Sequence, residues 1–130
     1  EIGIIGFGRF GKLAAGYLCR YFKVYVHDRK KSRVNRNNKN IIYSTIDKVC
    51  KKDVVILAVP ISELENVLLG IKNLLKKGSL VADVCSVKER PAELMKKLLP
   101  KNVQILATHP IFGPDSAKDS IRGRKSIKII

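Results

Sequence analysis

Two residues of this sequence have side chains suited to proton transfer, and each follows a short apolar segment. Ser86 comes three residues after segment 80–83, and His109 comes two residues after segment 103–107. An imidazole can act as a general base near neutral pH, and a hydroxyl within hydrogen-bond reach can orient it. The sequence therefore predicts a catalytic pair of His109 and Ser86. A histidine that only stabilises a loop fits His109 equally well.

Other reactive side chains lie nearby or elsewhere in the chain. Cys85 has the chemistry of a nucleophile, but a small buried residue is the better interpretation, because nothing in the sequence marks it as an activated thiol. Lys88 either begins a helix or faces a bound substrate, and the sequence gives both alternatives equal weight. The other histidine, His27, lies within an apolar segment and has no comparable setting.

A glycine-rich turn stands between the apolar segment 2–5 and a helical pattern over 10–21. Its first glycine allows a tight turn, its second lets a pyrophosphate approach the backbone, and its third lets the helix pack closely on the strand. The N–H groups and dipole of the helix start also favour an anion. The turn therefore predicts a dinucleotide site, and a glycine-rich turn without a ligand is the alternative. The predicted binding residues here are Gly6, Phe7, Gly8, Arg9, Phe10 and Gly11.

An acidic residue follows the second apolar segment, 23–27. Asp28 lies 17 residues after Gly11, near the position where an acid binds the adenosine ribose hydroxyls. An acid there favours NAD, because its charge repels a 2′-phosphate. The basic residues that follow, beginning with Arg29, hold that phosphate if Asp28 turns away, so NADP stays an alternative. A third alternative is that Asp28 caps the next turn.

Apolar segments alternate with helical patterns along the chain, which predicts parallel βαβ units. The expected fold is α/β, a Rossmann-type, doubly wound and mostly parallel sheet. The expected strands are 2–5, 23–27, 41–43, 53–59, 80–83, 103–107 and 126–130, and the expected helices lie within 10–21, 44–51, 62–75 and 91–99. Ser62 and Glu65 have the spacing of a capping box at the start of the third helix.

In such a sheet, ligands bind beyond the carboxyl ends of the strands, where the strand order reverses. Val59 and Pro60 follow the fourth strand and are expected to line this crevice with the glycine turn. Ser86 and His109 follow the fifth and sixth strands, so we expect them to face each other beside the bound cofactor.

The composition limits the class of protein. The chain has 130 residues, the size of one domain, and no apolar run reaches the roughly 20 residues of a membrane span. Its three cysteines form no C-x-x-C pair, so we expect no metal and a reducing, cytoplasmic compartment. The net charge of +15 is spread along the chain without interleaved aromatic residues, so we expect no nucleic-acid partner. The first residue is Glu1 and not Met, so we expect a piece of a longer protein.

Three motifs together resemble the prephenate and arogenate dehydrogenases of tyrosine biosynthesis, and the plant-like arogenate branch most closely. They are the turn 6–11, Asp83-Val84-Cys85-Ser86-Val87-Lys88-Glu89, and Thr108-His109-Pro110-Ile111-Phe112-Gly113-Pro114. Two departures are Ile111, where the family usually has Met, and Asp28, which plant-type members using NADP often lack.

The resemblance implies that His109 is the catalytic histidine, that Ser86 assists it and the nicotinamide, and that Lys88 and Gly113 lie near the substrate. It implies oxidative decarboxylation of prephenate or arogenate, with hydride transfer to NAD or NADP. Residues 1–130 correspond to the NAD(P)-binding domain, and the family's helical domain for dimerisation and substrate binding is missing from this sequence. The alternatives are another NAD(P)-dependent dehydrogenase of the β-hydroxyacid type, or a non-catalytic Rossmann module that binds a dinucleotide or nucleic acid.

Overall fold

The computed structural model describes residues 1–30, 38–110 and 113–116. The predicted last strand, 126–130, and Ile111 lie outside these residues. The strands are β1 (Ile2–Ile5), β2 (Val24–His27), β3 (Ile41–Tyr43), β4 (Val54–Leu57), β5 (Leu80–Asp83) and β6 (Gln104–Ala107). The helices are α1 (Arg9–Leu18), α2 (Ile46–Cys50), α3 (Ile61–Ile71) and α4 (Glu89–Leu98).

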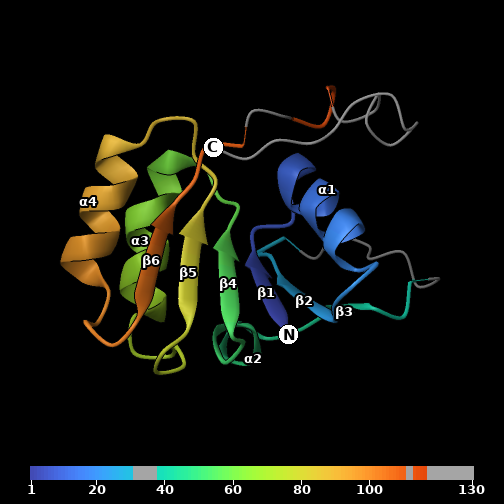
Figure 1. The fold of residues 1–130 in the computed structure, drawn as a ribbon, viewed down its shortest axis with the longest axis horizontal. Coiled ribbons are helices and arrows are strands. Elements are labelled where there is room, and N and C mark those ends of the chain that lie inside the picture. The colour runs from blue at the N-terminus through green and yellow to red at the C-terminus, as the bar shows by residue number, and fades with distance from the viewer. Residues whose placement is uncertain (31–37, 111–112, 117–130) are drawn as a thin grey trace.

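The six strands form one parallel sheet in the order β3-β2-β1-β4-β5-β6, which can be followed across Figure 1. The chain therefore has the expected Rossmann-type, doubly wound architecture. The order reverses between β1 and β4, where the crevice was expected. The last residues of five strands stand in register, so their carboxyl ends form one level edge: Ile5, His27, Leu57, Asp83 and Ala107.

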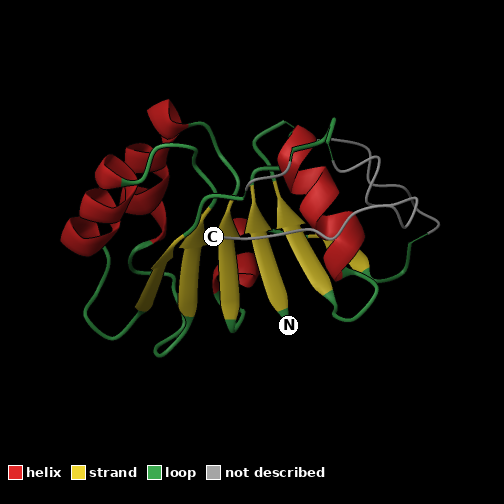
Figure 2. Ribbon diagram, turned by 45° about the horizontal axis from the view of Figure 1, so that its top comes forward, coloured by secondary structure: helices red, strands yellow, loops and turns green. Residues whose placement is uncertain are grey.

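Helices cover both faces of the sheet, as Figure 2 shows. Side chains of β1 alternate between the two faces. Ile2 and Ile4 belong to the core beneath α1, together with Ala15 of that helix. Ile5 belongs to the core on the other face, which α2, α3 and α4 complete. Each face of β1 is therefore buried, which explains its uninterrupted apolar sequence.

Several predicted boundaries were wrong by a few residues, and the backbone shows why. The first helix ends at Leu18 and not at residue 21, because the N–H of Tyr21 donates to Leu18 O in a tighter turn and its side chain is 80% exposed. The predicted capping box is also wrong. The third helix begins at Ile61 after Pro60, so Ser62 lies inside it and no side chain caps it.

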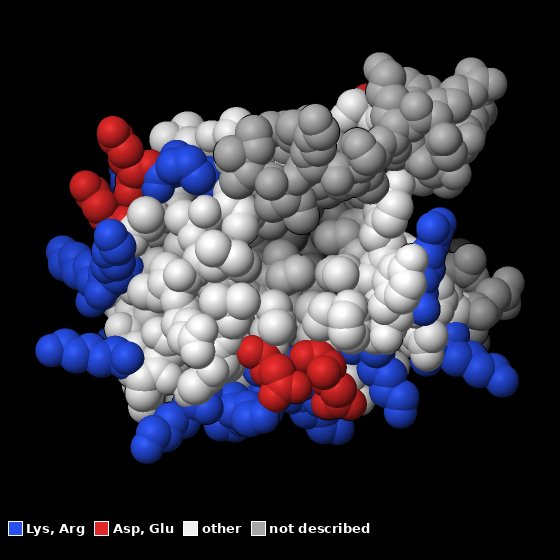
Figure 3. All heavy atoms as spheres, viewed as in Figure 1, with Lys and Arg blue, Asp and Glu red and all other residues white. Residues whose placement is uncertain are grey.

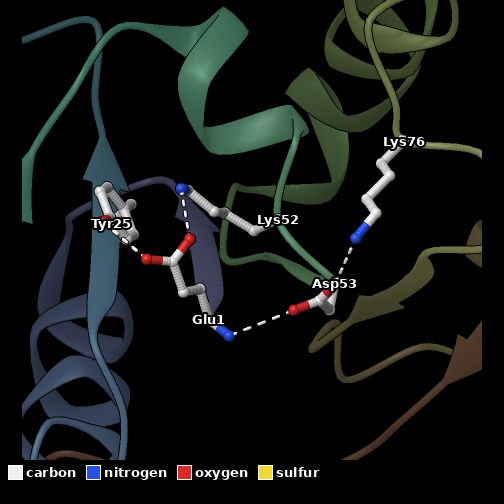
Figure 4. A network of polar contacts seen from close by, with 5 residues as sticks. All are labelled: Glu1, Tyr25, Lys52, Asp53 and Lys76. Carbon is white, nitrogen blue, oxygen red and sulfur yellow. Dashed lines mark hydrogen bonds and ion pairs between the residues drawn. The ribbon is translucent and has the colours of Figure 1, made fainter.

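The amino end of the sheet carries a network of polar contacts (Figure 4). Lys52 donates to Glu1 at 2.7 Å, and the Tyr25 hydroxyl donates to the same carboxylate at 2.8 Å. Lys76 donates to Asp53 at 2.6 Å and lowers the pKa of that carboxyl below its ordinary value. These contacts join Tyr25 of β2 and residues that precede β1, β4 and β5, at the edge opposite the expected ligand site.

The surface is strongly basic, but the charge is dispersed. Figure 3 shows Lys and Arg side chains around the rim of one face, while the centre of its uncovered part carries uncharged side chains. In the described part of the chain, no helix has the length and apolarity needed to cross a membrane.

Candidate functional site

The glycine turn joins β1 to α1 at the level edge of the sheet. Gly6 has φ of +98°, a conformation that L side chains rarely adopt, and its N–H donates to His27 O at 2.8 Å. A Cβ on Gly11 would lie 2.0 Å from Gly6 O, so this position tolerates no side chain. Gly6 and Gly11 are therefore required by the fold itself.

Gly8 differs from these two glycines. It precedes the first residue of α1 with φ of −74° and ψ of −160°, an extended backbone that any residue adopts. A Cβ built on it meets no atom within 4 Å. Neither backbone strain nor packing within the described residues explains a glycine here, so the open space above Gly8 is the feature that requires another explanation.

That space belongs to a cleft with two lobes along the carboxyl edge. The first lobe, a cavity of about 580 Å³, lies between the turn, the end of β2 and helix α3. The second, of about 540 Å³, lies between the start of α1 and the loop after β5. Both lobes are lined by Gly8, Ala58, Val59 and Pro60, so the turn and the residues after β4 form the ridge between them.

The predicted binding residues divide between the lobes. Gly6, Asp28 and Arg29 line the first lobe, and Arg9, Phe10, Ser86 and Gly113 line the second. Phe7 has a different role, because its ring is buried at 5% exposure in the core beneath α1. Only its backbone N–H has a polar partner near the lobe, because it donates to the Asp28 carboxylate at 2.6 Å.

Asp28 is fixed at the end of β2 by backbone groups. One carboxylate oxygen accepts from Phe7 N–H at 2.6 Å, and the other accepts from Lys30 N–H at 2.8 Å. The Tyr43 hydroxyl bonds to the Asp28 backbone. The contact with Lys30 is the turn-capping bond considered from the sequence, and the contact with Phe7 ties β2 to the glycine turn. An ionised carboxylate accepts about four hydrogen bonds, so each oxygen keeps capacity for a ligand hydroxyl.

Two arginines of the cleft are paired with carboxylates. Arg29 contacts Glu63 of α3 at 2.6 Å across the first lobe. Arg9 donates to both carboxylate oxygens of Asp115 at 2.8 and 2.9 Å beside the second lobe. Both pairs are exposed, so each contributes about 1 kcal/mol or less to stability.

The loops after β5 and β6 are joined by Lys88. Its ammonium contacts the carboxylate of Asp83 at 3.1 Å and donates to Thr108 O. Asp83 is fully buried, and it also accepts from Cys85 N–H at 2.9 Å. The Thr108 hydroxyl donates to Asp83 O. Lys88 also stands at the start of α4, which confirms one of the two alternatives for this residue. Its side chain therefore connects two loops, and its place near the substrate stays a prediction.

These joined loops carry the predicted catalytic pair. Ser86 is exposed and lines the second lobe, and His109 is exposed beside Pro110, which lines the same lobe. Since β5 and β6 are neighbours in register, the residues that follow them lie at the same edge. The structure thus brings both loops to the second lobe, while a direct contact of Ser86 with His109 stays a prediction.

Other reactive groups do not form a second site. Burial raises the pKa of the Cys85 thiol to about 11, which leaves it protonated at neutral pH and agrees with its interpretation as a buried residue. His27 Nδ1 lies 3.0 Å from Ser44 O, a contact within the first lobe's wall. Among the described residues, no group of three or more His, Cys, Asp or Glu side chains is placed to hold a metal ion.

Sequence reasoning missed the contribution of α3 to the first lobe. Glu63, Asn66, Val67 and Gly70 line it from one face of that helix. Their spacing of three and four residues marks one face of a helix, but nothing in the sequence showed that this face borders the cleft. Only the pairing of Glu63 with Arg29 shows that the polar side of this face reaches the cleft.

Comparison with known protein families identifies the domain. A family model described as prephenate dehydrogenase, nucleotide-binding domain, matches residues 14–126. The chain belongs to this family. Arogenate dehydrogenase 2, chloroplastic, from Arabidopsis thaliana is 36% identical over 128 residues, and arogenate dehydrogenase 1 of the same plant is 34% identical over 125. The resemblance to the plant-like branch is confirmed.

The chain spans only about a third or less of the length of these two plant relatives. The two alignments cover 95% and 92% of this chain but 36% and 20% of the plant proteins. Prephenate dehydrogenase from Aquifex aeolicus has a TM-score of 0.71 at 22% identity, covering 86% of this chain and 43% of that one. An imine reductase from Streptomyces aurantiacus has a TM-score of 0.72 at 21% identity, covering 88% and 42%. The fold alone therefore does not separate these activities.

Proposed function

We propose that this domain binds NAD or NADP across the two-lobed cleft, with the adenosine half in the first lobe and the nicotinamide in the second. The observation that carries this proposal is the open space above Gly8 at the ridge between the lobes. A pyrophosphate joins the two halves of a dinucleotide, and a residue without Cβ at this ridge allows it to reach the backbone.

The surroundings of the ridge fit an anion. Helix α1 begins here, and no acidic residue lies in its first turn. The first N–H groups of a helix lack intrahelical partners, and the helix dipole places partial positive charge at this end. Asp28 lines the first lobe, where its carboxylate oxygens suit the hydroxyls of a ribose.

We further propose that the domain serves an oxidative decarboxylation of prephenate or arogenate, the substrates in its relatives' names. His109 accepts the proton of the ring hydroxyl, and Ser86 orients the imidazole or that hydroxyl. A bound nicotinamide supplies the acceptor for the hydride that leaves the hydroxyl-bearing carbon. The ring carboxylate leaves as carbon dioxide, and its electron pair makes the ring aromatic.

The choice between the two substrates depends on a side-chain amine or keto group. We assign the binding of that group, and dimerisation, to a helical domain of a longer protein. The support is that the relatives exceed this chain in length, with 36% or less of either plant protein matched.

Calorimetric titration of the 130-residue chain with NAD and with NADP tests the first proposal. We expect saturable binding of at least one dinucleotide, and binding of neither would refute it. The net charge of +15 makes nucleic acid the natural competitor. A salt titration with duplex DNA distinguishes the two, because tight and steeply salt-dependent DNA binding without dinucleotide binding would favour the nucleic-acid module.

A further inference from the structure

An ion pair in the lining of the first lobe joins the residues after β2 to helix α3. Arg29 lies two residues after the end of β2, and Glu63 lies in the first turn of α3. Their charged atoms lie 2.6 Å apart, and both residues line the cavity. The Arg29 side chain is 79% exposed and that of Glu63 is 35% exposed, so the pair is open to solvent and to an entering ligand.

Arg29 is well suited to bind a phosphate at this place. A guanidinium donates in a planar fork that matches phosphate oxygens. The preceding residue, Asp28, is expected to bind the hydroxyls of a ribose, so a 2′-phosphate on that ribose would lie beside Arg29. Rotation of the Asp28 carboxylate away from such a phosphate is unfavourable, because it breaks the hydrogen bonds that the N–H groups of Phe7 and Lys30 donate to it.

We propose that Glu63 is a specificity-determining residue that disfavours a dinucleotide with a 2′-phosphate, an inference that rests on the proposed dinucleotide binding. It acts in two ways. It engages the guanidinium of Arg29, which a 2′-phosphate would otherwise attract, and it places a second negative charge at the lobe besides Asp28. NADP must break the Arg29–Glu63 pair to use Arg29, whereas NAD has no group that requires the guanidinium.

A matched control stands on the same helix. Glu65 lies two residues after Glu63 and approaches Arg90 at 3.9 Å, and it does not line the described cavities. Replacement of either glutamate by glutamine removes one negative charge from α3 and changes the net charge of the chain equally. A difference in the NADP-to-NAD affinity ratio between the two variants is therefore caused by the location of Glu63 at the lobe, and not by the change in overall charge.

The experiment is calorimetric titration of the 130-residue chain with NAD and with NADP at one fixed ionic strength. An exposed ion pair changes an equilibrium constant by about two- to fivefold. We expect Glu63→Gln to tighten NADP binding by about that factor relative to NAD, and Glu65→Gln to leave the ratio unchanged. If wild-type NADP binding is too weak to titrate, the same comparison is made in the Asp28→Asn background, which lowers the repulsion.

A double substitution tests the role of Arg29. If Glu63 acts in part through Arg29, the gain in NADP binding from Glu63→Gln should be smaller in an Arg29→Gln protein, where only the direct repulsion by the Glu63 carboxylate remains. An unchanged NADP-to-NAD ratio in Glu63→Gln, or an equal gain in Glu65→Gln, would overturn the inference. A wild-type chain that binds neither dinucleotide would instead refute the proposed function, so the two failures are distinguishable.

Discussion

Replacing Gly8 by valine tests whether this glycine is required for folding or for binding of the dinucleotide. The backbone at Gly8 is extended, with φ of −74°, and nothing lies within 4 Å of a Cβ placed there. A valine is therefore accommodated without strain or displacement of neighbours. We expect Gly8→Val to fold with a stability close to that of the wild type.

The loss in binding follows from where the side chain would lie. Gly8 lines both lobes, so the two methyl groups of valine would stand on the ridge that the pyrophosphate must cross. The phosphate oxygens are then displaced from the N–H groups at the start of α1. A hydrogen bond to a charged group is worth about 1.5–3 kcal/mol, so losing one weakens binding about 10- to 150-fold.

Calorimetry with NAD and NADP measures this loss, and circular dichroism with urea unfolding confirms that the variant is folded. Gly16→Val is the matched control, because Gly16 lies on the same helix, also has open space around its Cβ, and lines neither described lobe. It should keep wild-type affinity. A folded Gly8→Val protein with unchanged affinity for both dinucleotides would refute the placement of the pyrophosphate at this ridge.

Three further predictions concern the loops after β5 and β6. In an enzyme that joins this domain to a substrate-binding domain, His109→Asn should lower turnover by about 10²–10⁴-fold with little change in dinucleotide affinity, and retention of wild-type turnover and pH profile would make His109 structural. Lys88→Met leaves the buried Asp83 carboxylate without its cation and should lower the free energy of unfolding by about 3 kcal/mol in urea titrations, whereas Lys97→Met, at an exposed position of α4, should change it little. Burial raises the pKa of Cys85 to about 11, so its alkylation by iodoacetamide at pH 8 should be about two orders of magnitude slower than in the unfolded chain. The rate should increase as the pH rises towards that pKa. Equal rates for the folded and unfolded chains, measured by mass spectrometry, would contradict this prediction.

Much of the fold was predictable because its signals are local. The run of apolar residues in β1 and the glycines that follow it have few alternative structures, since Gly6 requires a positive φ and Gly11 a close approach. The doubly wound parallel sheet was predictable because strands alternate with helices along the chain and the glycine fingerprint marks the first strand of such a sheet. The same signal located the cleft at the correct edge.

Side-chain pairing was less predictable because it depends on which elements meet. Arg29 and Glu63 are 34 residues apart, and nothing in their local sequence shows that β2 ends opposite the start of α3. Lys88 illustrates the same limit. Its position at the start of α4 was one of the two expected alternatives, but the sequence did not show that its ammonium reaches back five residues to Asp83 and across to Thr108 O.

The charges of the cleft bear on how it would recognise an anion. The chain carries a net charge of +15, yet the arginines that line the lobes are each paired with a carboxylate, Arg29 with Glu63 and Arg9 with Asp115. Such pairs leave little net charge at short range, and, apart from Lys30 in the first lobe, the dispersed lysines of the described residues act at distances where salt screens them. We therefore expect close-range recognition of a pyrophosphate to fall to the backbone at the start of α1, where a dipole and N–H groups act without a mobile side chain. For the same reason we expect dinucleotide binding to depend on the glycine at position 8 more than on the abundance of lysine.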